Sequence, residues 1–154
     1  MSDKVTDLKK IIELPIDSLR SFDVVEEQFS DLGVLFTNTV VLQPSNSLYL
    51  PKFGKMVLMG APQNGLIEVN FTLPVIYFAC SLTSSQHATV RAFDDDGKTL
   101  CVFETEKSNH ENPDSLVSQP TPNIPISMQA QNIQKITLSS LDGQLVIYNI
   151  RFGF

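Results

Sequence analysis

Apolar and polar residues alternate in two stretches of the chain. From residue 66 to 73 every odd-numbered residue is apolar, and Glu68, Asn70 and Thr72 lie between them. Ala88–Phe93 alternates in the same way. Because successive side chains of a β-strand point to opposite faces, this period of two predicts strands with one buried face.

Turn-forming residues punctuate these stretches. Asn64-Gly65 precedes the first and is a strong hairpin signal, and Asp94–Gly97 follows the second as a hairpin turn. Pro74 predicts a break or an edge position, since proline cannot donate to a sheet ladder. The nearly all-apolar run Val75–Leu82 predicts a central strand covered on both faces.

Other short apolar segments follow the same rhythm of strand and turn, and Leu145–Phe152 closes the chain as a strand. The expected total is about eight to ten short strands, from the regular spacing of these segments. Such regular spacing is typical of an all-β sandwich or barrel.

The chain is predicted to contain one domain, residues 21–154, preceded by an N-terminal segment, residues 1–20. Within that segment Val5, Leu8, Ile11 and Ile12 have the spacing of a short amphipathic helix, which Pro15 would end. The pattern around Ile11 fits an edge strand equally well, so both alternatives remain open. Residues 107–122 are polar and contain three prolines, which predicts a long loop within the sandwich.

Composition narrows the function classes. The chain has 154 residues, of which 42% are hydrophobic and 18% are charged, as expected for a globular domain with a weakly charged surface. The net charge of −6 and the scattered basic residues argue against nucleic-acid binding. No apolar run is long enough to span a membrane, and the first residues do not form a secretory signal. We therefore expect a cytoplasmic protein.

The densest group of polar side chains is Asp94, Asp95 and Asp96, followed by Gly97. Clustered carboxylates suit a hard cation such as Ca²⁺, which takes several oxygen ligands. A hairpin turn also favours Asp and Gly, for local hydrogen bonds and left-handed backbone angles. The turn interpretation is favoured, because the spacing is not that of an EF-hand loop. No other cofactor is expected.

Histidine and cysteine offer little further chemistry. His87 and His110 are the two histidines, and each lies among polar residues typical of loops. The chain lacks the G-x-S-x-G sequence of a nucleophile elbow and lacks a C-x-x-C metal motif. Cys80 and Cys101 lie inside apolar runs and are expected to be buried free thiols, with a disulfide as the alternative. We therefore expect a protein that is not an enzyme.

The order of packing and turn residues resembles that of jelly-roll β-sandwich domains of bacteria, of the galactose-binding-like and carbohydrate-binding-module type. The pattern is F-x-x-L-G-V-x-F, then P-V, then V-x-A-F-D-x-D-G-x-x-L, then a closing I-x-x-I-x-F strand. The matching positions are Phe29, Leu32, Gly33, Val34, Phe36, Pro74, Val75, Val90, Ala92, Phe93, Asp94, Asp96, Gly97, Leu100, Ile147, Ile150 and Phe152. This chain departs from exported examples in having neither a signal peptide nor a sorting tail. It also lacks tryptophan, a favoured sugar-stacking side chain.

The resemblance implies an antiparallel jelly-roll sandwich that acts as a non-enzymatic binding module. Its ligand would be a carbohydrate or another polar ligand, held by loops at one end or by the concave sheet. The alternative is a structural or assembly subunit, in which edge strands or the N-terminal segment mediate protein–protein contacts or homo-oligomer formation. The ligand-binding residues are not predicted by the sequence.

Overall fold

A computed structural model describes residues 10–45, 49–52, 54–61, 65–84, 87–105, 121–140 and 145–154. Over these ranges no helix is long and apolar enough to cross a membrane. The described residues form ten strands and two short 3₁₀ turns: β1 (Ile11–Glu13), η2 (Ile16–Ser18), β2 (Val24–Val25), η3 (Ser30–Leu32), β3 (Val34–Thr37), β4 (Thr39–Leu42), β5 (Val57–Gly60), β6 (Ile67–Ser84), β7 (Ala88–Phe93), β8 (Thr99–Glu104), β9 (Thr121–Ser140) and β10 (Leu145–Gly153).

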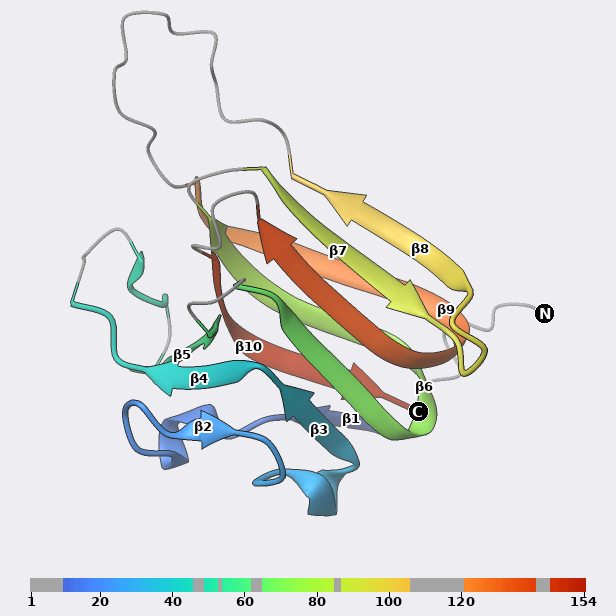
Figure 1. Cartoon of the computed structure of the whole chain (residues 1–154), viewed down its shortest axis with the longest axis horizontal. Coiled ribbons are helices and arrows are strands. Elements are labelled where there is room, and N and C mark those ends of the chain that lie inside the picture. The colour runs from blue at the N-terminus through green and yellow to red at the C-terminus, as the bar shows by residue number, and fades with distance from the viewer. Residues whose placement is uncertain are drawn as a thin grey trace, which may run out of the picture.

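The strands form two antiparallel layers that share β6 and β9 (Figure 1). In the first layer, here called sheet I, the order is β8, β7, the C-terminal half of β9, the N-terminal half of β6, and β3. In the second, sheet II, the order is β2, β4, β5, β10, the C-terminal half of β6, and the N-terminal half of β9. This architecture confirms the predicted all-β antiparallel sandwich.

Strands β6 and β9 pass from one sheet to the other through a bend. Their ladder shifts register between Asn70 and Val75, and Pro74 lies exposed inside this gap. Near the gap the Gln134 side-chain amide donates a hydrogen bond of 3.0 Å to the Phe71 carbonyl. The break predicted at Pro74 is therefore the corner at which one long strand changes sheets.

The core lies between the two sheets. Phe71 of sheet I packs against two rings of sheet II, with centroid separations of 5.1 Å to Phe152 and 6.4 Å to Phe78. These rings are surrounded by aliphatic side chains from both layers, such as Ile136 and Ile147, which are fully buried. Packing of this kind fixes which side of each strand faces inward, and therefore which side chains face outward.

The segment before residue 21 is part of the same sandwich. Ile11–Glu13 pairs with β10 as strand β1, so the edge-strand alternative holds for the described part, while residues 1–9 lie outside the described residues. Leu14 and Ile16 belong to the hydrophobic core. Most of the predicted loop, residues 107–122, also lies outside the described residues, and β9 begins at Thr121.

The prediction of a hairpin at Asn64-Gly65 is wrong, because the strands on either side, β5 and β6, do not pair with each other. Strand β5 pairs with β4 and β10, whereas the N-terminal half of β6 pairs with β3 and β9. The chain does turn here, and Gly65 has a positive φ of 66°. The turn connects two sheets instead of two neighbouring strands, because each flanking strand finds its partners elsewhere.

Candidate functional site

Two segments of the chain cover the part of the outer face of sheet II around Val146 and Tyr148. Val146 and Tyr148 alternate with the core residue Ile147 and therefore point outward, yet they are only 4% and 3% exposed. The Tyr148 hydroxyl accepts a hydrogen bond from the Lys52 backbone N–H and donates one to Asn123 Oδ1, at 2.9 and 2.6 Å. The loop that contains Lys52 therefore lies over this face.

The N-terminal segment covers the neighbouring part of sheet II. Asp17 accepts hydrogen bonds from the backbone N–H groups of Lys55 and Met56, which ties this segment to the same loop. Between the residues 13–17, the loop and Tyr148 lies a pocket of about 280 Å³. Gly54 has a φ of 74°, and a Cβ there would lie against the Asp17 carboxylate, so the loop conformation favours glycine at this position.

No such cover lies over the outer face of sheet I among the described residues, because the side chains that alternate with its core positions are half-buried or exposed. The strand register places them in rows. One row contains Leu35, Asn70, Lys135 and Phe93, from β3, β6, β9 and β7 in turn. The next row contains Thr37, Glu68, Thr137, Arg91 and Val102. This surface, the sheet I outer face, carries amides, hydroxyls, charges and one aromatic ring side by side.

Two contacts hold side chains of this face in place. The Lys135 ammonium lies 5.6 Å from the centroid of the Phe93 ring, a cation–π contact. The Asn70 amide donates a hydrogen bond of 3.0 Å to Glu68 Oε2. The face is therefore partly preorganised, and its polar groups extend over β6, β9 and β7.

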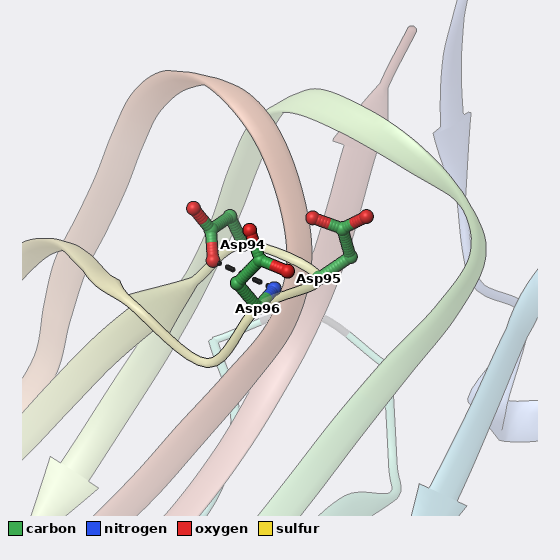
Figure 2. Close-up of side chains that lie close together, drawn as sticks. All are labelled: Asp94, Asp95 and Asp96. Atoms are coloured by element: carbon green, nitrogen blue, oxygen red, sulfur yellow. Dashed lines mark hydrogen bonds between the residues drawn. The ribbon is translucent and has the colours of Figure 1, made fainter.

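The three aspartates form the turn between β7 and β8 (Figure 2). Asp94 Oδ1 accepts hydrogen bonds of 2.9 Å from the backbone N–H groups of Asp96 and Lys98, and Gly97 has a φ of 81°. One carboxylate oxygen from each aspartate lies within 4.8 Å of the others. The Asp94 side chain thus stabilises the turn by accepting backbone hydrogen bonds. The calcium site at Asp94, Asp95 and Asp96 stays a prediction.

The histidines and cysteines are placed apart from this turn. His87 Nε2 lies 3.2 Å from Glu104 Oε1 at the opposite end of β7 and β8, and His110 lies outside the described residues. Both cysteines are free thiols; Cys80 is buried as expected, whereas Cys101 is only half-buried. Burial raises the pKa of Cys80 to about 12, against a smaller opposing effect of Arg151. Burial also raises the pKa of Cys101, so neither thiol is activated as a nucleophile.

Comparison with solved structures identifies the fold of this chain, whereas comparison of sequences finds no match. No protein-family model matches the sequence, and no characterised protein matches it by sequence search. The K2 cleaved adhesin domain of Lys-gingipain aligns with a TM-score of 0.61 and 10% identity, covering 94% of this chain and 98% of that domain. The α-L-arabinofuranosidase MgGH51 aligns with a TM-score of 0.52 and 12% identity, covering 95% of this chain and 27% of the enzyme.

A family 29 carbohydrate-binding module from Piromyces equi matches more distantly, with a TM-score of 0.44, 9% identity, and coverage of 79% and 80% of the two chains. That likeness is too low to support an argument. The two higher matches confirm the β-sandwich fold expected from the sequence resemblance, and at such low identity they establish the fold alone.

Proposed function

We propose that the protein is a non-enzymatic carbohydrate-binding module whose ligand lies on the sheet I outer face. The observation that carries this proposal is the set of side chains that the strand register brings together there. An amide (Asn70), a hydroxyl (Thr137) and an aromatic ring (Phe93) lie on neighbouring strands, and the Lys135 ammonium and Glu68 carboxylate make contacts that hold Phe93 and Asn70 in place.

The chemistry of this face suits a sugar ring. A pyranose presents hydroxyl groups around its edge and C–H groups on its faces. Asn70 and Thr137 offer hydrogen-bonding groups, and the half-buried Phe93 offers an aromatic surface. These side chains are on strands instead of loops, which holds them in fixed relative positions and lowers the entropic cost of binding.

A glycan array tests the proposal, followed by titration calorimetry of the best binders with Phe93→Ala. We expect saturable binding that Phe93→Ala weakens by about tenfold, since stacked aromatic contacts are worth about 1.5 kcal/mol at most beyond burial. Phe22→Ala is the matched control, because Phe22 is 77% exposed and precedes β2 at the edge of sheet II. Absence of binding to every glycan, or equal loss in the two variants, would refute the proposal.

A second candidate is the assembly function, and Phe22 is the observation that favours it. This side chain is 77% exposed although its φ is 74°, a backbone region that bulky residues rarely adopt. Val24 of the edge strand β2 is 57% exposed beside it. Light scattering tests this candidate: a dimer that Phe22→Ala converts to a monomer supports it, and a monomer at every concentration eliminates it.

A further inference from the structure

Glu104 lies opposite Thr89, next to the Arg91–Val102 pair, and so belongs to the same outer side of sheet I as Glu68. Both carboxylates are already engaged. Glu68 Oε2 accepts the 3.0 Å hydrogen bond from the Asn70 amide. Glu104 Oε1 lies 3.2 Å from Nε2 of His87. Each acid therefore has a neighbouring donor that is neither lysine nor arginine.

The two strongly basic side chains of the same face are not matched by acids. Arg91 of β7 is exposed, and Lys135 of β9 is half-buried. Among the described residues no carboxylate oxygen lies within the 4.0 Å ion-pair distance of either side chain. The contact that Lys135 makes instead is with the Phe93 ring.

Arg91 and Lys135 lie close enough to act on one ligand. Arg91 is directly opposite Thr137, and Lys135 precedes Thr137 by two residues on β9, so the two basic residues are diagonal neighbours. Diagonal neighbours on one face of an antiparallel pair are about 7–8 Å apart. Both side chains can therefore reach a single charged substituent and the ring that carries it.

We propose that the sheet I outer face selects anionic sugars, through Arg91 and Lys135. This inference rests on the proposed carbohydrate-binding function and names the class of sugar. The planar Arg91 guanidinium suits two parallel hydrogen bonds to a carboxylate or sulfate, and Lys135 adds a point charge. The chain carries a net charge of −6, so its overall field repels anions, and recognition depends on this local pair.

Affinity electrophoresis with matched polysaccharides tests the inference. The first pair is polygalacturonate and the same polymer after reduction of its carboxylates to hydroxymethyl groups. The second pair is dextran sulfate and dextran, which distinguishes a sulfate ester from a uronate. We expect retardation by the anionic member of at least one pair and at least tenfold weaker retardation by its neutral counterpart.

Three variants connect the result to the site. Arg91→Gln and Lys135→Gln should each weaken binding of the anionic polymer by about tenfold, as hydrogen bonds to charged groups are worth at least about 1.5 kcal/mol. Lys55→Gln is the control, because it makes the same change of charge on the loop that covers sheet II. Circular dichroism and melting temperature verify that each variant is folded.

The outcomes separate the two proposals. Equal retardation by the charged and neutral polymers, unchanged in Arg91→Gln, overturns the anionic preference and leaves the carbohydrate-binding proposal standing. Loss of binding in Lys55→Gln as large as in Arg91→Gln also overturns it, since attraction is then not specific to this face. Retardation by none of the polymers, together with an empty glycan array, refutes both proposals.

Discussion

Replacing Asp94 separates its role in the turn from a role in metal binding. As a turn residue, Asp94 works through Oδ1, which accepts the hydrogen bonds from the Asp96 and Lys98 backbone at 2.9 Å. Asp94→Asn keeps a carbonyl oxygen at this position and should melt close to the parent protein. Asp94→Ala removes the acceptor and should destabilise the fold.

The loss of stability expected for Asp94→Ala follows from the number of hydrogen bonds removed and from their exposure to solvent. Two hydrogen bonds at about 1 kcal/mol each give an upper value of about 2 kcal/mol, and solvent at this exposed turn lowers it. For a domain of this size each 1 kcal/mol shifts the melting temperature by about 2–4 °C. Asp94→Ala should therefore melt about 2–8 °C lower, whereas Asp95→Ala, which alters an exposed side chain, should change stability by less than about 0.5 kcal/mol.

The calcium prediction is tested by melting the same proteins in 10 mM Ca²⁺ and in EDTA. A site with a dissociation constant of about 1 mM would add about 1.4 kcal/mol of stability at that concentration, which is readily detected. Such a gain should disappear in Asp95→Asn if the carboxylates bind the ion. Identical midpoints in calcium and EDTA would refute the metal site, and an Asp94→Asn variant as unstable as Asp94→Ala would refute the turn argument.

Three further changes test the fold and its thiols. Gly60→Ala should lower the free energy of unfolding, measured in urea, by about 3 kcal/mol or more. The added Cβ of residue 60 would lie 2.7 Å from the Gly65 Cα and closer still to the Gly65 carbonyl, and unchanged stability would contradict this contact. Tyr148→Phe loses two hydrogen bonds of its hydroxyl and should lower the melting temperature by about 2–8 °C, and an unaltered melt would argue against the covering loop. The folded Cys80 thiol keeps its proton to a pKa of about 12 whereas the unfolded thiol loses it near 9.0, so stability should fall between these pH values. Cys80→Ala should show a smaller fall, measured by urea unfolding at each pH.

Much of the fold could be predicted because the signals are local. The alternation in 88–93 identified β7, and the Asp94–Gly97 turn correctly joined it to β8. The apolar run 75–82 correctly predicted a central strand, since β6 lies between β10 and β9, but cover on both faces holds only around Ala79, because Tyr77 and Ser81 are half-buried. In each case a short stretch of sequence contains both the pattern and the reason for it.

The connections between sheets could not be predicted in the same way. Asn64-Gly65 has the chemistry of a hairpin, but the partners of the flanking strands are chosen by long-range packing. Gly65 instead lies against Gly60, where two backbones approach too closely for any side chain. A turn signal thus indicates where the chain reverses and leaves open which strands become neighbours.

The candidate binding face was missed for a related reason. Alternation alone implies that Glu68 and Arg91 point away from the core, but only the register shows that Thr137 lies between them on a third strand. The accessibility of each outer face depends even more on residues that are distant in the sequence. It depends on the loop hydrogen-bonded to Tyr148 and on the segment held through Asp17, neither of which has a periodic pattern. These two segments cover sheet II around Val146 and Tyr148, whereas Ser127 and Gln129 of β9 stay exposed on the same side of that sheet. The location of the proposed site therefore follows from the side chains that the register brings together on sheet I, a grouping that no short stretch of sequence contains.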